Sequence, residues 1–118
     1  AMPTFAMALD LIDDPRVIAQ YEAHHRAVWP EVLAALRRTG LADMKIFRSG
    51  CHLFMVMTAP EGFDPARAFR DYARDPAVKR WDELMRGLQR PVPHARPGDW
   101  WTPIPCVFDL ARPDGAPG

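Results

Sequence analysis

Three Asp-Pro pairs mark the starts of helices more firmly than any other feature of this chain. They stand at Asp14-Pro15, Asp64-Pro65 and Asp75-Pro76. Aspartate is a favoured helix N-cap, and proline suits the first helical position because its fixed φ and missing N–H group do no harm there. Each pair therefore predicts that a helix begins at its proline.

The first predicted helix covers residues 15–38, but Pro30 lies inside it. Proline removes a backbone donor and clashes with the preceding turn, so this helix should kink or restart near Trp29. Gly40 follows as a typical C-terminal stop. The other two helices are expected over residues 65–74 and 76–88.

Short apolar-rich runs before, between and after these helices predict strands. The first run covers residues 4–11, and two others, 43–48 and 52–58, flank a Ser-Gly-Cys turn at 49–51. Two such runs around a tight turn predict a β-hairpin. A last strand is expected over residues 106–110.

The resulting order is strand, helix, strand, strand, helix, strand. This β-α-β-β-α-β order is that of ferredoxin-like α+β domains with an antiparallel sheet. Residues 1–110 are expected to form one such domain, and residues 111–118 a loose tail. The stretch 91–105, with five prolines, is expected to be a stiff extended connection. Strand 52–58 carries apolar residues on both faces, so a second subunit should cover the outer face, and we expect a homodimer.

Composition argues against several classes of protein. Fifteen basic and fifteen acidic residues cancel among the 118, unlike the charge of nucleic-acid or membrane-surface binders. No apolar run approaches the ~20 residues that span a bilayer, and no signal peptide is apparent, so a cytoplasmic protein is expected. Cys51 and Cys106 should be reduced. No histidine has zinc-ligand spacing, and neither a metal nor a cofactor is expected.

Tyr21, His25 and Trp29 follow one another at intervals of four residues. Residues four apart share one face of a helix, so this stripe places a group that titrates near neutrality between two aromatic rings. Such rings can stack on the C–H faces of sugars. The alternative is a core stripe with a buried histidine. His24 points about 100° away and is expected to face solvent or an interface.

A second aromatic group lies toward the C-terminus. Trp81 heads an apolar helical stripe, which by itself is typical of core packing, and the neighbouring Asp82 would be solvated unless it faces His25 across a cavity. Trp100 and Trp101 follow the Pro-rich stretch. They could anchor that loop, form a lid whose Trp101 contacts a substrate, or dock into a neighbouring subunit.

Together these residues form a pattern that extends over most of the chain. It reads Y-x-x-x-H-x-x-x-W-P-E from Tyr21 to Glu31, then Gly40, a hairpin, and Arg80-Trp81. The pattern resembles the L-rhamnose mutarotase family over about residues 5–110. The resemblance implies a cofactor-free, homodimeric aldose 1-epimerase of ferredoxin-like, dimeric α/β-barrel fold. Such an isomerase interconverts the α and β anomers of a 6-deoxy-L-hexose, L-rhamnose or L-fucose.

The resemblance also assigns roles. It implies that His25 is a general acid, that Tyr21 contacts the sugar, and that Trp81 is the first of two tryptophans on the last helix. Two positions depart from the pattern: Met44 stands where rhamnose-type members carry tyrosine, and Asp82 replaces the second tryptophan. Both are expected in the substrate pocket. W-D-E-L-M and PGDWW look more like a branch associated with L-fucose.

The implied chemistry suits these residues. Mutarotation requires one group to protonate the ring oxygen and another to remove the anomeric proton, and a group with a pKa near 6.5 can do either. The second group is left open between Asp82 and a water held by Tyr21. Two other functions on this fold stay open. One is a non-catalytic sugar-binding or stress-responsive dimer, and the other is a cofactor-free monooxygenase-like enzyme.

Overall fold

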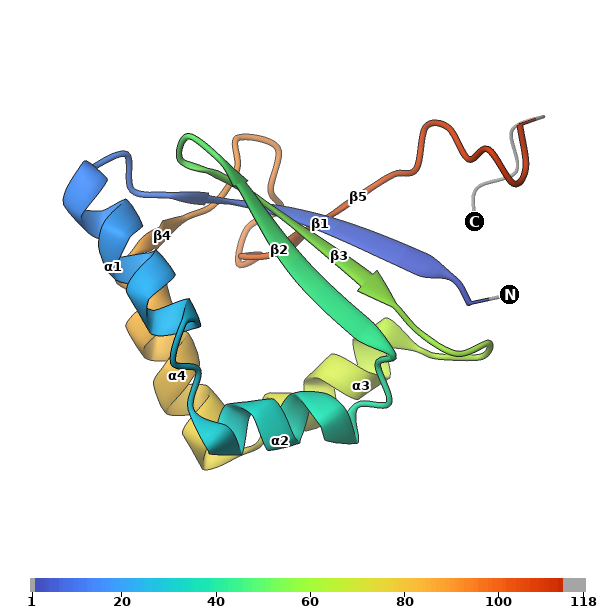
Figure 1. Cartoon of the computed structure of the whole chain (residues 1–118), viewed down its shortest axis with the longest axis horizontal. Coiled ribbons are helices and arrows are strands. Elements are labelled where there is room, and N and C mark those ends of the chain that lie inside the picture. Colours follow the sequence, from blue (N-terminus) through green and yellow to red (C-terminus); the bar gives the residue numbers. More distant parts are fainter. Residues whose placement is uncertain (1, 114–118) are drawn as a thin grey trace.

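The structure, a computed structural model, describes residues 2–113. Three long strands form the centre of an antiparallel sheet: β1 (Thr4–Leu11), β2 (Asp43–Ser49) and β3 (His52–Thr58). The sheet order is β2-β3-β1-β4, and β5 also pairs with β1. All helices lie on one side of this sheet (Figure 1). The ferredoxin-like α+β fold expected from the sequence is thereby confirmed.

Four helices cover the inner face of the sheet. They are α1 (Pro15–His25), α2 (Pro30–Arg38), α3 (Pro65–Tyr72) and α4 (Pro76–Arg86). The side chain of the aspartate in each Asp-Pro pair accepts a hydrogen bond from a backbone N–H of the first turn, as predicted. The first predicted helix restarts at Pro30, also as predicted. The last two helices each end two residues earlier than expected.

The prediction of a last strand over residues 106–110 is wrong. The place beside β1 is taken by two short strands, β4 (Gln89–Arg90) and β5 (Thr102–Ile104). Pro105 follows β5 and has no N–H group to continue the pairing, so the chain leaves the sheet there. Residues 106–110 extend away from the body of the protein (Figure 1), and Val107 is 94% exposed.

The connection between β4 and β5 is not the extended segment that its prolines suggested. Two tight turns shape it, with hydrogen bonds from the N–H of Ala95 to the carbonyl of Val92 and from that of Asp99 to the carbonyl of Arg96. These turns return the chain to the sheet. They bring Trp100 and Trp101, both half-buried, to the space between the inner face of the sheet and the helices.

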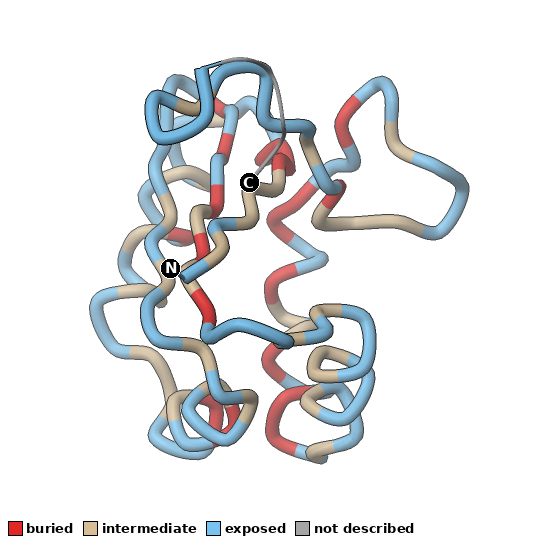
Figure 2. The backbone as a smooth tube through the Cα atoms, turned by 90° about the vertical axis from the view of Figure 1, so that its right-hand side faces the viewer, coloured by how far each residue is buried: buried red, intermediate tan, exposed pale blue. Residues whose placement is uncertain are grey.

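The strands bury one face and leave the other open. In β3 the buried residues Leu53, Met55 and Met57 alternate with more exposed neighbours, as expected for side chains with a period of two. Figure 2 shows the buried positions on the inner sides of the elements and exposed loops around them. On the outer face, Asp10 is 5% exposed and its carboxylate lies 2.7 Å from Nδ1 of His52.

Three further expectations concern the C-terminal tail, membrane crossing and the two cysteines. The predicted tail, 111–118, lies outside the described residues from 114 onward, and residues 111–113 are exposed. Among the described helices, none has the length and apolar character that a bilayer crossing requires. Cys51 and Cys106 are both free thiols, the first buried and the second exposed.

Candidate active site

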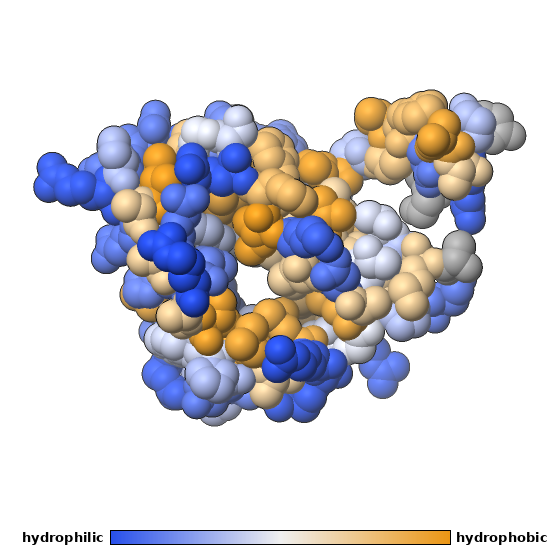
Figure 3. Space-filling view, in the orientation of Figure 1, coloured by the Kyte–Doolittle hydropathy of each residue, from blue (hydrophilic) through white to orange (hydrophobic). Residues whose placement is uncertain are grey.

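A cavity of about 910 Å³ lies between the inner face of the sheet and the helices. Figure 3 shows it as a hollow rimmed by hydrophobic side chains. Its volume falls in the range typical of small-molecule sites. The apolar wall includes Met7, Val28, Val32, Leu33, Leu36, Met44, Ile46, Met55, Phe69 and Met85. The polar groups are few: Tyr21, His25, Asp64, Tyr72, Asp82, Arg86 and Gln89.

His25 is the last residue of α1, and its ring is held in one orientation. The ring stacks on that of Tyr21, with centroids 4.2 Å apart and an interplanar angle of 30°. Its Nδ1 lies 2.9 Å from the carbonyl oxygen of Tyr21. A carbonyl can only accept, so Nδ1 carries the proton and Nε2 of the neutral ring has a free lone pair.

Trp81 holds this arrangement together from α4. It is 6% exposed and meets the ring of His25 edge-on at 5.5 Å and that of Trp29 at 5.2 Å. Trp29 caps the start of α2 and does not line the cavity. The helix breaks between His25 and Trp29, so the predicted stripe does not continue along one helix. The rings of His25 and Trp29 instead both contact Trp81.

His24, which was expected to face solvent or an interface, lies beside Trp81. It is half-buried, and its ring lies 6.3 Å from that of Trp81, nearly perpendicular to it. It does not line the cavity. The aromatic ring of Trp81 is wide enough to contact both histidines, which the spacing along α1 alone could not indicate.

Burial shifts the titration of the groups around the cavity. It lowers the pKa of His25, which also has a positively chargeable neighbour in His24, although the hydrogen bond with the Tyr21 carbonyl opposes this. Burial likewise raises the pKa of the Tyr21 phenol above its usual value. At neutral pH the site therefore contains a neutral imidazole and a protonated phenol.

The α4 side of the cavity carries a carboxyl group. Burial raises the pKa of Asp82, and the charge of Arg86, one helical turn later, opposes that shift. Tyr72 lines the same cavity, and its phenol pKa is raised by burial and by the negative charges of Asp82 and Asp75. Asp82 is thus a hydrogen-bond acceptor in a mostly apolar wall.

Met44 and Trp101, the other expected substrate contacts, also line the cavity, as does Trp100. Met44 lies on the inner face of β2, paired with Met57. Trp100 lies under the guanidinium of Arg86, 5.7 Å from its ring centroid. Both tryptophans thus line the cavity within this chain.

Gln89 and Tyr72 line the cavity but were not singled out in the sequence. Gln89 is 9% exposed and pairs with Leu11 across β4 and β1, and its side chain acts to lower the pKa of the Tyr21 phenol against the larger effect of burial. Its inward position depends on the register of a two-residue strand. No local pattern in the sequence fixes that register.

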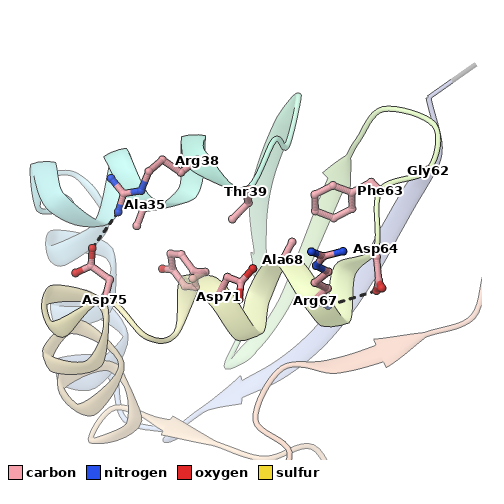
Figure 4. A pocket seen from close by; sticks show the side chains of 11 residues that line it. Ala35, Arg38, Thr39, Gly62, Phe63, Asp64, Arg67, Ala68, Asp71 and Asp75 are labelled. Carbon is pink, nitrogen blue, oxygen red and sulfur yellow. Dashed lines mark hydrogen bonds and ion pairs between the residues drawn. The ribbon is translucent and has the colours of Figure 1, made fainter.

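A smaller hollow of about 350 Å³ lies between α2 and α3. Figure 4 shows three of its charged side chains engaged: Asp75 binds Arg38 at 3.0 Å, and Asp64 accepts from the backbone N–H of Arg67. Within residues 2–113, no three histidine, cysteine or acidic side chains are grouped as metal ligands would be. The larger cavity is therefore the better site for a small molecule.

Comparisons with known proteins agree with this geometry. A sequence model of the L-rhamnose mutarotase family matches residues 4–110. The chain is 45% identical to the L-fucose mutarotase of Xanthomonas campestris pv. campestris over 95% of its length and 91% of the relative's. It is 33% identical to the L-rhamnose mutarotase of Acidiphilium cryptum, over 82% of this chain and 89% of that one.

A solved structure supports the fold. The crystal structure of the L-rhamnose mutarotase of Formosa agariphila superposes with a TM-score of 0.64 and 20% sequence identity, covering 91% of this chain and 97% of that one. Family match and relatives agree with the family that the sequence resembles, and the solved structure agrees with the fold. The chain belongs to the L-rhamnose mutarotase family, whose members are isomerases that interconvert sugar anomers.

Proposed function

We propose that this protein is a mutarotase for a 6-deoxy-L-hexose, with L-fucose as its preferred sugar and His25 as the group that transfers the proton. The observation that supports this most directly is the hydrogen bond between Nδ1 of His25 and the Tyr21 carbonyl. It leaves Nε2 as the only site of proton exchange on the ring. That ring lines a cavity with room for a monosaccharide.

The reaction then proceeds in two proton transfers. Neutral His25 takes the proton of the anomeric hydroxyl through Nε2 as the bond between C1 and the ring oxygen breaks and C1 becomes an aldehyde. The imidazolium delivers that proton to the ring oxygen. After rotation of the aldehyde, the steps run in reverse on its other face. His25 is the base when one oxygen loses its proton and the acid when the other gains it.

Two neighbours of His25 support this chemistry. The hydroxyl of Tyr21 stays protonated and can donate a hydrogen bond to the ring oxygen as negative charge develops there. The indole of Trp81, held edge-on to His25, and the rings of Trp100 and Trp101 offer apolar surface to the C–H groups and methyl group of the sugar. Such an enclosure also limits the access of water.

Asp82 favours L-fucose over L-rhamnose in this proposal. The relative named an L-fucose mutarotase is 45% identical to the chain. The two sugars differ in the configuration of ring hydroxyls, and a half-buried carboxylate discriminates between such hydroxyls because an unpaired position costs free energy. In this assignment Asp82 recognises the ring hydroxyls of the sugar, and His25 transfers the proton.

A homodimer is part of the same proposal. The outer face of the sheet exposes Phe47 and Phe54, which are paired across β2 and β3 and are 54% and 40% exposed. Contiguous apolar surface on a sheet face is typical of an interaction site. A second copy packed on this face would cover both rings. The cytoplasm stays the proposed location.

The first experiment measures exchange between the anomeric proton signals of L-fucose and L-rhamnose by NMR, with and without catalytic amounts of protein. Faster exchange, greater for L-fucose, is the expected result. If neither sugar exchanges faster but L-fucose raises the melting temperature, the protein is a sugar-binding dimer instead. Light scattering after size exclusion tests the dimer, with Phe54→Glu as the variant expected to dissociate it.

A further inference from the structure

Trp100 and Trp101 are neighbours in the sequence, but different contacts hold their rings. Both line the large cavity. Trp101 packs against the hydrophobic core of the protein. The ring of Trp100 lies beneath the guanidinium of Arg86, whose central carbon is 5.7 Å from the centre of the ring. This contact joins the end of α4 to the segment that connects β4 with β5.

The contact between Arg86 and Trp100 has the geometry of a cation–π interaction. A guanidinium within about 6 Å of the centre of a tryptophan ring is attracted by the electrons of the ring face. Arg86 is exposed, yet it also lines the cavity, so it lies at the rim. The attraction therefore acts where residues 91–101 close one side of the cavity.

The rest of the segment before Trp100 is loosely packed. Residues 93, 94 and 96–98 are exposed. Two backbone turns shape the segment, and the hydroxyl of Thr102 donates a hydrogen bond of 3.2 Å to the carbonyl of Trp100. These hydrogen bonds fix the backbone, whereas the direction of the indole depends on its side-chain contacts. A contact from α4 can therefore determine how firmly the ring stays in the cavity wall.

A ring that is already in place favours binding of a sugar, because a ring that must be ordered on binding adds an entropic cost. We propose that Arg86 is a positioning residue for the sugar, which holds the ring of Trp100 in the cavity wall through a cation–π contact. The inference rests on the proposed function, since it concerns the same cavity. Arg86 acts through Trp100 and need not touch the sugar.

Arg86 has a second neighbour in the cavity wall, from which its effect on Trp100 must be separated. Asp82 lies one helical turn earlier on α4, and the charge of Arg86 favours its ionised form. An effect through Asp82 depends on the charge and is independent of Trp100. An effect through the ring requires Trp100 and is strongest for a flat guanidinium, which an ammonium cannot replace. A double substitution therefore distinguishes the two routes.

The test compares Arg86→Met, which keeps an apolar stem and removes the charge, with Trp100→Leu and with the double variant in the full-length protein. Anomer exchange of L-fucose, followed by NMR, gives kcat and KM for each. Lys79→Met is the matched control, because Lys79 is an exposed cation on the same helix and outside the cavity. Circular dichroism checks that each variant is folded.

A second measurement follows the ring itself without any sugar. Incorporation of 5-fluorotryptophan gives a fluorine NMR signal for Trp100, which is assigned by its loss in Trp100→Leu. The difference in its chemical shift between H2O and D2O reports how far the ring is exposed to solvent. This difference should grow in Arg86→Met and stay unchanged in Lys79→Met.

We expect Arg86→Met to raise KM about two- to fivefold, the scale of a cation–π contact at an exposed site, with little change in kcat. Arg86→Lys should show part of the same loss, since the ammonium keeps the charge but lacks the flat surface. The double variant should have the KM of Trp100→Leu alone. Lys79→Met should match the wild type.

Wild-type KM in Arg86→Met, or unchanged solvent exposure of its Trp100 signal, would overturn the inference while the mutarotase stands. A loss that persists in full when Trp100 is already leucine would also overturn it, because the effect would then act through Asp82. A wild-type protein that accelerates neither sugar would instead overturn the proposed function, and the fluorine signal would still show whether Arg86 holds the ring.

Discussion

His25 stacks on the ring of Tyr21, one helical turn earlier in α1, and hydrogen-bonds through Nδ1 to the carbonyl oxygen of that same residue. One residue thus fixes both the plane of the imidazole and its tautomer. Nε2 is the atom left to exchange protons. The end of α1 places His25 in the cavity wall, where Trp81 meets its ring edge-on.

Replacing His25 by glutamine should abolish most of the activity and leave the fold intact. Glutamine cannot exchange a proton near neutrality, so kcat should fall by at least about 10²-fold, the usual contribution of general acid–base catalysis. Because the side chain is only half-buried, the melting temperature should change little. His24→Gln is the control and should retain activity. A folded, fully active His25→Gln would exclude this residue as the catalyst.

Activity should fall on acidification. The pKa of His25 is lowered by burial, so the neutral, proton-accepting form persists to a pH below the ordinary value of about 6.5. The rate kcat/KM for anomer exchange should be constant near neutrality and half-maximal below that value. Asp82 and Arg86 of α4 also line the cavity, so their charges influence the midpoint, whereas the two tyrosines stay neutral over this range.

His24 provides a check on that titration. Its charge disfavours protonation of His25, so His24→Gln should move the midpoint of the pH profile upward. NMR titration of the imidazole signals measures the same shift directly. A midpoint above 6.5 in the wild type would contradict the assignment of His25 as a desolvated base.

Substitution of Asp82 should change the choice of sugar more than the fold. Asp82→Trp introduces the residue expected at this position in rhamnose-type members and removes the acceptor, so the ratio of kcat/KM for L-fucose to that for L-rhamnose should fall at least about tenfold. Asp82→Asn preserves the shape and should have a smaller effect. Competition between the two sugars in one NMR sample gives the ratio. An unchanged ratio in both variants would remove Asp82 from substrate recognition.

Asp75 should contribute more to stability than the arginine it binds. Its side chain accepts from the N–H of Ala77 at the start of α4 and from Arg38. Asp75→Ala loses the helix cap and should reduce the free energy of unfolding by about 1–2 kcal/mol. Arg38→Ala removes only the pair, whose arginine is 63% exposed, and should change it by less than about 1 kcal/mol. Urea denaturation of both variants gives the comparison.

The sequence determined the elements whose signals are local. The Asp-Pro pairs at 14, 64 and 75 cap three helices. Pro30 ends the first predicted helix and begins α2. Gly50 adopts the positive φ that the hairpin turn requires. Each of these depends on a few adjacent residues. The motif from Tyr21 to Glu31 likewise identified the family, because it is contiguous.

Only the tertiary structure decided which residues meet. The strand beside β1 comes from residues 89–90 and 102–104, because an apolar run such as 106–110 pairs only if the chain can reach a free edge. The register of that short strand turned Gln89 into the cavity, and the packing of α4 brought Trp81 against His25 and Trp29. These contacts join residues more than fifty positions apart, and no local propensity encodes such distances.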